Sequence, residues 1–338
     1  RIHPETGLPI VPSRFGWTSV FAEEILELAR ADERIVAVTA AMQQPVGLQP
    51  MADALPDRVI DVGIAEQHAL TASAGMAFAG LHPVVALYAT FLNRAFDQVL
   101  MDVGLHHAGV TIVLDRAGLT GTDGASHNGM WDMALLAHVP GLRLAAPRDE
   151  TTLREDLRTA AATSDGPTVL RYPKGALPER APALRVMGPP NDPFEAVDVL
   201  MEADDDGPGE RRLLLVAVGA MTPAVLAAGR DLADEGRAVA VVAPRWVVPI
   251  PRALVETARS FDGVVVVEDG LVDGGIGSQL RDALEDNTAE TGRRCPVVAR
   301  VGVPRRFLGT ASRKQLLADF GMDAEGIAAT ARRLLSAV

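Results

Sequence analysis

The chain has 338 residues, enough for about two domains of ordinary size, and 48% of them are hydrophobic, as expected of a globular protein with a large core. A formal net charge of −12 argues against nucleic acid as a partner, because a phosphate backbone needs a dense Lys and Arg surface. The single cysteine, Cys295, excludes an internal disulfide framework and is consistent with a reducing compartment. With no signal peptide and no apolar run of about 18 residues, the sequence predicts a cytoplasmic protein with no membrane contact.

The chain opens with a loop-like, proline-rich segment. Residues 1–15, RIHPETGLPIVPSRF, start at Arg1 rather than at a methionine and show no periodic pattern. We expect this segment to be a linker from a preceding N-terminal domain.

Apolar runs rich in β-branched residues then alternate with stretches whose apolar residues recur at helical spacing. The expected strands are 34–40, 58–63, 82–88, 110–115, 142–147 and 167–173. The expected helices are 18–32, 65–80, 90–107 and 149–164. Thr18 and Asp149 are the expected N-caps. Such alternation predicts a parallel sheet covered by helices on both faces.

A proline-rich stretch, 174–193, interrupts the alternation, which resumes further along the chain. The later expected strands are 212–220, 237–244, 261–269 and 296–302. The acidic segment 202–210 is expected to be a solvated hairpin or loop. We therefore predict an α/β protein of two domains, 16–185 and 186–338, each with a mainly parallel sheet flanked by helices.

The segment 59–80, VIDVGIAEQHALTASAGMAFAG, places Glu66 where an expected strand meets an expected helix. In α/β sheets, ligands bind at the carboxyl ends of strands. A first-turn glutamate is commonly just exposed, where it complements the helix dipole. The helix that follows is built mostly from small residues, however, so that another backbone or a flat ligand could approach closely. Position alone leaves both interpretations open.

The segment 115–129, DRAGLTGTDGASHNG, places Arg116 at a strand end and Asp123 and His127 in a glycine-rich loop. Such loops are usually tight turns, and no Lys-Ser/Thr pair follows the glycines as in a P-loop. The arginine could fix an anionic substrate while the histidine moves protons. Arg171, in LRYPKG, has the same kind of strand-end position. Two arginines converging from different strands would suit a terminal phosphate.

The segment 88–102, YATFLNRAFDQVLMD, places Tyr88 at a strand end, Phe91 in the turn and Arg94 one turn into a helix. Phe91 could stack on a planar ring or could belong to the core. The pattern does not decide between them.

Four segments together resemble the 1-deoxy-D-xylulose-5-phosphate synthases, thiamine-diphosphate enzymes related to transketolase. These segments are DVGIAEQHA, YATFLNRAFDQ, DRAGLTGTDGASHNGMWD and LRYPKG. The resemblance continues with VVVVEDGLVDGGIGSQL and FGMDAEGI in the second half. It implies a pyrimidine-binding domain followed by a transketolase C-terminal domain.

The resemblance also implies roles for individual residues. Glu66 would hydrogen-bond N1′ of the cofactor's aminopyrimidine and so activate the thiazolium carbon, and Phe91 would stack on the pyrimidine. The residues that match the cofactor pocket are Ile64, Glu66, Tyr88, Phe91 and Arg94. The residues that match the substrate site are Tyr88, Arg116, Asp123, His127 and Arg171. Of these, the two arginines would bind the substrate phosphate and His127 would transfer a proton.

The implied reaction joins the two-carbon unit of pyruvate to D-glyceraldehyde 3-phosphate on thiamine diphosphate. Its product, 1-deoxy-D-xylulose 5-phosphate, feeds isoprenoid, thiamine and pyridoxal precursors. In such enzymes Mg²⁺ is held by a Gly-Asp-Gly…Asn segment of a preceding domain, and the Asp-Gly pairs of this sequence lack that spacing. We therefore expect this chain to supply the pyrimidine half of the site, with the diphosphate-binding domain in cis or as a separate chain, in a homodimer or heterotetramer.

Two features stay uninterpreted, and two alternatives stay open. Gln43, Gln44 and Pro45 depart from the family pattern, and DGGIGSQL at 273–280 could bind an anion but fits a tight turn better. One alternative is a subunit of a split transketolase or of a 2-oxo-acid dehydrogenase of the β type, with other substrates. The other is a non-catalytic partner half.

Overall fold

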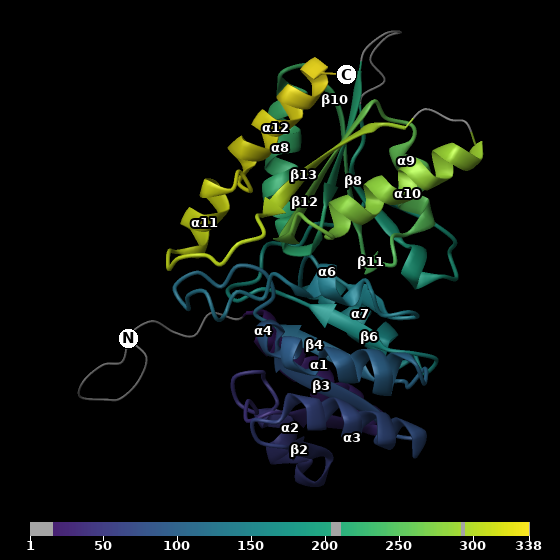
Figure 1. Ribbon diagram of the computed structural model, residues 1–338, viewed down its shortest axis with the longest axis vertical. Helices are drawn as coiled ribbons and strands as arrows, with labels where there is room; N and C mark the ends of the chain where they lie inside the picture. The colour runs from purple at the N-terminus through teal and green to yellow at the C-terminus, as the bar shows by residue number, and fades with distance from the viewer. Residues whose placement is uncertain (1–15, 204–210, 292–294, 338) are drawn as a thin grey trace, which may run out of the picture.

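The computed structural model describes residues 16–203, 211–291 and 295–337. The expected linker 1–15 and most of the expected acidic loop 202–210 lie outside the described residues. Within these ranges, no helix has the length and apolar character needed to cross a membrane. Figure 1 shows two stacked units, the first drawn purple to teal and the second green to yellow.

The first unit is built on a sheet that has, among the described residues, seven strands in the order β11-β5-β6-β4-β3-β1-β2. Its own strands are β1 (Ile35–Thr39), β2 (Val59–Asp61), β3 (His82–Tyr88), β4 (Thr111–Asp115), β5 (Arg143–Ala145) and β6 (Thr168–Arg171), all paired in parallel. Its longer helices are α1 (Trp17–Ala31), α2 (Gln49–Ala54), α3 (Glu66–Phe78), α6 (Asp132–Leu136) and α7 (Glu150–Ala161). The central strands are buried on both faces, which is why they appear as continuous apolar runs.

The second unit has a sheet of the order β13-β12-β9-β10-β8-β7 within the described ranges. Its strands are β7 (Arg185–Met187), β8 (Val197–Met201), β9 (Arg212–Ala217), β10 (Ala238–Pro244), β12 (Gly263–Leu271) and β13 (Val297–Val303). Its helices are α8 (Thr222–Asp234), α9 (Arg252–Ala258), α10 (Ile276–Thr291), α11 (Arg313–Asp319) and α12 (Ala324–Ala337). Pairing is parallel except at β7–β8 and β8–β10. The predicted fold class, two mainly parallel sheets flanked by helices, is confirmed.

One strand crosses between the units. β11 (Trp246–Val248) directly follows the second sheet's β10, but it pairs antiparallel with β5 and so becomes the edge of the first sheet. Trp246 is only 1% exposed and packs against the ring of Phe194. The two units are therefore interlocked through backbone hydrogen bonds as well as side-chain contacts.

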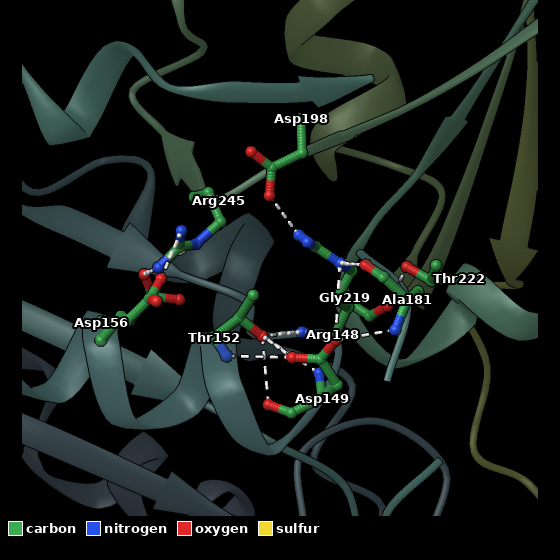
Figure 2. Close-up of polar contacts among 10 residues, drawn as sticks. Arg148, Asp149, Thr152, Asp156, Ala181, Asp198, Gly219, Thr222 and Arg245 are labelled. Carbon is green, nitrogen blue, oxygen red and sulfur yellow. Dashed lines mark hydrogen bonds and ion pairs between the residues drawn. The ribbon is translucent and has the colours of Figure 1, made fainter. Parts of the chain in front are cut away.

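Buried charges join the units beside this crossing, as Figure 2 shows. Arg245 Nη2 lies 2.6 Å from Asp156 Oδ1, and Arg148 forms an ion pair with Asp198 of β8. Asp149 Oδ2 also accepts the N–H of Ala181 at 3.0 Å. Because every one of these charged groups except Arg245 is buried, their pairing fixes how the units are oriented.

Two local predictions need correction and one is confirmed. Asp149 is the N-cap of α7, where its side chain accepts the N–H of Thr152 at 2.9 Å. Thr18 is not an N-cap, because α1 begins one residue earlier at Trp17, and the Thr18 hydroxyl instead donates to Asp115 Oδ2 at 2.6 Å. The sequence around Thr18 could not indicate this bond, because the acceptor Asp115 lies 97 residues away.

The expected continuous helix over 90–107 is also wrong in detail. The segment is helical, but it is divided into α4 (Ala89–Leu92), a 3₁₀ turn (Asn93–Ala95), α5 (Phe96–Gln98) and a π-helix (Val99–Gly104). Apolar spacing indicates a buried helical face without distinguishing these hydrogen-bond registers, and π turns of this kind are frequent near functional sites.

Candidate active site

A tight turn leads from β2 into α3 and fixes the start of that helix. Asp61 Oδ1, at the end of β2, accepts the N–H groups of Ala41 at 2.7 Å and of Gly63 at 3.0 Å. Gly63 has a φ of +73°, a left-handed conformation that side chains disfavour. Glu66 follows as the first residue of α3. The predicted position of Glu66, where a strand leads into a helix, is confirmed.

The Glu66 side chain is buried and incompletely bonded. The residue is 3% exposed, and its Oε2 atom has no hydrogen-bond partner among the described residues. Arg94 Nη1 lies 3.8 Å from this oxygen, but the Arg94 side chain is 60% exposed and forms an ion pair rather than a hydrogen bond. Buried polar atoms are nearly always bonded, so the open oxygen leaves Glu66 able to accept a hydrogen bond from a donor outside the described residues.

Two of the segments singled out from the sequence, 88–102 and 115–129, meet at a group of aromatic rings. Tyr88 and Phe91 stack with ring centroids 5.7 Å apart, and the rings of Phe91 and His127 form a T-shaped pair with centroids 5.7 Å apart. The Arg116 guanidinium lies over the Tyr88 ring at 3.9 Å. Phe91 and His127 are both half-buried. The structure thus brings Tyr88, Phe91, Arg116 and His127 into one cluster.

Arg116 has an unusual backbone and well-defined partners. Its φ of +59° is left-handed for a residue with a side chain, which costs roughly 1–3 kcal/mol and is typical of functional sites. Its Nη1 atom lies 3.0 Å from Asp115 Oδ1 and donates to the Pro45 carbonyl at 3.4 Å. The segment Gln43–Pro45, which departs from the family pattern, therefore borders this cluster.

Arg171 lies deeper than its strand-end position suggested. It is 4% exposed, its Nε atom lies 2.6 Å from Asp132 Oδ2, and its Nη2 atom donates to the Asp269 carbonyl at 2.7 Å. Arg116 and Arg171 are thus held by different partners, one at the aromatic cluster and one between the two units. Their joint role at a phosphate stays a prediction.

The loop after β4 places Asp123 and His127 on its partly exposed side. The Lys174 ammonium binds Asp123 at 2.8 Å, and His127 Nδ1 lies 2.9 Å from the Ser126 hydroxyl. Lys174 was not among the predicted site residues. It belongs to the same LRYPKG segment as Arg171, and this shared segment could have indicated that it lies near the loop.

Several exposed apolar residues lie around α3, beside its exposed polar residues Gln67, His68 and Thr71. Ile64, next to Glu66, is 78% exposed, and Gly75 has open space where a side chain would project. The other exposed large apolar residues in this region are Phe78, Leu81, Met101 and Leu105. An apolar patch of this kind indicates an interaction surface.

Comparison with known proteins assigns both units. The family model described as "Transketolase, pyrimidine binding domain" matches residues 13–180, and "Transketolase, C-terminal domain" matches residues 203–327. The chain belongs to the transketolase family. Glu66, the aromatic cluster and the loop after β4 all lie in the pyrimidine-binding domain.

Relatives within this family include enzymes that make 1-deoxy-D-xylulose 5-phosphate, to judge from their names. The 1-deoxy-D-xylulose-5-phosphate synthase of Renibacterium salmoninarum is 52% identical over 97% of this chain and 48% of its own length. The 1-deoxy-D-xylulose-5-phosphate synthase 2 of Kitasatospora griseola is 51% identical over 99% of this chain and 51% of its own length. The chain thus spans about half the length of the curated relatives it matches.

Solved structures show the same fold. A protein described as "Split gene transketolase, inactive beta4 tetramer" superposes with a TM-score of 0.79 at 27% identity, covering 96% of this chain and 99% of that one. The transketolase from Leishmania mexicana superposes with a TM-score of 0.75 at 20% identity, over 98% of this chain and 47% of that one. The second likeness supports the fold alone.

Proposed function

We propose that this chain supplies the pyrimidine-binding half of a thiamine-diphosphate-dependent transferase of the 1-deoxy-D-xylulose-5-phosphate synthase type. The observation that carries the proposal is the buried carboxylate of Glu66, whose Oε2 atom lacks a hydrogen-bond partner among the described residues. About half the residues are identical to synthases of that name over nearly the whole chain.

The residues around Glu66 fit an aminopyrimidine. Its open oxygen can accept a hydrogen bond from a protonated ring nitrogen, and Phe91 offers an aromatic surface nearby. Ile64 and Arg94 are exposed residues next to Glu66, one apolar and one cationic. Bound thiamine diphosphate would supply a nucleophilic carbon for a 2-oxo acid. Glu66 would hold the proton on the ring nitrogen, and that is its role in the proposal.

The loop after β4 and the two arginines would bind the substrates, pyruvate and D-glyceraldehyde 3-phosphate. Arg171 uses Nε and Nη2 for bonds to its neighbours, and we assign its Nη1 atom, which has no partner among the described residues, to a phosphate oxygen. Arg116 would be the second phosphate ligand. His127, with Tyr88 and Asp123 close by, would transfer a proton at the aldehyde oxygen.

The other half of the site would come from a diphosphate-binding domain in cis or from a separate chain, with Mg²⁺ bound there. A neighbour described as a split-gene transketolase supports the second arrangement. We propose that the exposed apolar residues around α3 pack against a second copy, giving a homodimer or heterotetramer. The enzyme would work in the bacterial cytoplasm, and its product would feed isoprenoid, thiamine and pyridoxal precursors.

Mixing tests the proposal. The chain is combined with the diphosphate-binding half of a synthase, together with thiamine diphosphate and Mg²⁺. We expect cofactor binding by calorimetry and formation of 1-deoxy-D-xylulose 5-phosphate only when both halves are present. Absence of cofactor binding on mixing would overturn the split arrangement, and unchanged turnover of a Glu66→Ala variant would overturn the role of Glu66.

A second candidate is a split transketolase or a 2-oxo-acid dehydrogenase of the β type, with a different donor or acceptor. It is favoured by the fact that the split-gene transketolase chain is covered over 99% of its length. This candidate keeps Glu66 but does not need Arg116 and Arg171 at a phosphate. Assays of pyruvate with D-glyceraldehyde 3-phosphate, and again with unphosphorylated D-glyceraldehyde, separate the two, because only the synthase should join pyruvate to the aldehyde with a preference of roughly 100-fold in kcat/KM for the phosphorylated form.

A further inference from the structure

The base of the loop that carries Asp123 and His127 is held by the second unit. The Leu119 N–H donates to Asp269 Oδ1 at 2.9 Å, and Arg313 Nη1 donates to the Leu119 carbonyl at 2.6 Å. The same Arg313 atom lies 2.6 Å from Asp269 Oδ2. An ion pair from the C-terminal domain therefore binds both polar groups of one loop residue.

This contact is buried and admits little change in its neighbours. Leu119 is fully buried and Asp269 is 2% exposed, so their hydrogen bond is shielded from competing water. Gly118, with a φ of +73°, lies so close that an added Cβ atom would fall 2.2 Å from the Asp269 carboxylate. Gly121 likewise meets the backbone of Arg313, 2.7 Å from where its Cβ would stand. At Gly118 and Gly121 the loop therefore packs so closely against the second unit that a larger residue would not fit.

The far end of the loop is bound to the same strand. The Leu271 N–H, two residues after Asp269 on β12, donates to the Met130 carbonyl at 3.1 Å. Gly118 and Gly129 exchange backbone hydrogen bonds of 2.9 and 2.8 Å, which close the neck of the loop. Both ends of the loop are thus hydrogen-bonded to the end of β12. At the tip of the loop, His127 contacts the ring of Phe91. In Figure 1 the loop lies between the two units, beside the lower end of α11.

We infer that Asp269 and Arg313 are positioning residues. Their ion pair, in the C-terminal domain, fixes the position of the loop and thereby the position of His127 relative to the acceptor aldehyde. This inference rests on the proposed function. It gives the second unit a part in acceptor binding, although none of its side chains belongs to the predicted site.

The experiment uses the enzyme reconstituted from both halves. Asp269→Ala removes the acceptor for Leu119 and the partner of Arg313, whereas Asp269→Asn keeps an acceptor oxygen and removes only the charge. Arg332→Ala is the matched control, because it breaks the exposed pair with Glu235 on the same unit. Hydrogen exchange of peptides covering 118–130, the KM for D-glyceraldehyde 3-phosphate and pyruvate decarboxylation without acceptor are measured.

For Asp269→Ala we expect exchange of the loop and the KM for the aldehyde each to rise roughly tenfold, because a shielded hydrogen bond and an ion pair are lost. Acceptor-free decarboxylation should stay within about twofold, because positioning at the aldehyde is not used there. The Asp269→Asn variant should be intermediate, and the Arg332→Ala control should match the wild type.

Unchanged loop exchange in Asp269→Ala would overturn the inference. So would faster exchange with an unchanged KM for the aldehyde, or an equal loss of decarboxylation and carboligation in both Asp269 variants, which would mean a purely structural contact. If the wild type forms no 1-deoxy-D-xylulose 5-phosphate, the proposed function fails. The exchange measurement, which needs no substrate, then still decides whether Asp269 holds the loop.

Discussion

Two buried glutamates, one in each unit, have opposite bonding. Glu66 begins α3 and Glu268 lies on β12, and the two residues are 3% and 0% exposed. Glu268 accepts the N–H groups of Ile276 at 2.7 Å and of Gly277 at 3.0 Å, one on each carboxylate oxygen. Glu66 is itself the first residue of its helix, and its Oε2 atom stays open among the described residues.

The difference shows that burial alone does not mark a functional carboxylate. Glu268 fills the N-terminus of α10 from within, and Gly275 lies so close that an added Cβ atom would fall 2.3 Å from its Oε2 atom. The N–H groups of the DGGIGSQL segment that could bind an anion are therefore already bonded to the Glu268 carboxylate. Both oxygens of Glu268 already accept a backbone N–H, whereas the Oε2 atom of Glu66 is left able to accept a hydrogen bond from a ligand.

The largest expected effect sharpens this comparison at Glu66. In Glu66→Gln, turnover of the reconstituted enzyme should fall by roughly 10²–10⁴, the usual contribution of a positioned proton-transfer group. The free energy of unfolding of the isolated chain should stay the same or rise, because an unsatisfied buried carboxylate is removed. Steady-state kinetics and urea denaturation check the two halves of this prediction. A clear loss of stability would mean that Glu66 is a cap like Glu268.

Glu268→Ala should show the reverse behaviour. Two buried N–H groups at the start of α10 lose their acceptor, which should lower the free energy of unfolding by about 2–4 kcal/mol. Cofactor binding at Glu66 should be retained at temperatures where the variant is folded. Urea denaturation and calorimetry with thiamine diphosphate provide the measurements. Unaltered stability would contradict the cap.

The pH dependence of stability separates the two carboxylates further. Burial raises the pKa of Glu268 to about 7 from an ordinary 4.5, against the lowering effect of the two N–H donors. The folded state therefore binds the Glu268 proton more tightly than the unfolded state, and the stability from this group is complete below pH 4.5 and is lost as pH rises through 7. At about 1.36 kcal/mol per pH unit the loss is at most about 3 kcal/mol.

Glu268→Gln should remove this part of the slope. Urea denaturation of both proteins at pH 5 and pH 7.5 measures it as a difference, since the raised pKa of Asp156 affects them equally. Identical pH dependence in the two proteins would show that Glu268 is already ionised at pH 5.

The smallest effect is expected at Arg94. Its guanidinium lies 3.8 Å from Glu66 Oε2, but the side chain is 60% exposed, so water screens the pair. Arg94→Ala should change turnover by less than about fivefold and stability by less than about 1 kcal/mol. Arg252→Ala, which breaks an exposed pair with Glu256, is the control. A loss as large as that of Glu66→Gln would make Arg94 part of the proton-transfer machinery.

Much of the fold could be predicted because parallel strands buried on both faces leave continuous apolar runs. The expected 82–88 and the observed His82–Tyr88 agree fully. The crossing of β11 could not be predicted, since its three residues follow β10 at once and nothing local indicates a change of sheet. The registers within 89–104 were likewise hidden, because apolar spacing is alike in α-, 3₁₀- and π-helical turns.

The candidate site could be predicted as far as local position goes. The junction at Glu66 follows from a strand and a helix pattern placed end to end, but its open oxygen depends on every neighbour. For Arg171, the strand-end position was predictable and the burial was not, because its partner Asp269 is 98 residues away. Contacts of such long sequence separation require the tertiary structure.

The exchange of β11 between sheets also limits how the gene can be divided. A truncated polypeptide that stops within 174–193 would leave the Arg143–Ala145 strand as an open edge, with free backbone groups that recruit other chains. Expressing the first family module by itself is therefore expected to give aggregated material, and engineered fusions should keep everything through Val248 on the same polypeptide.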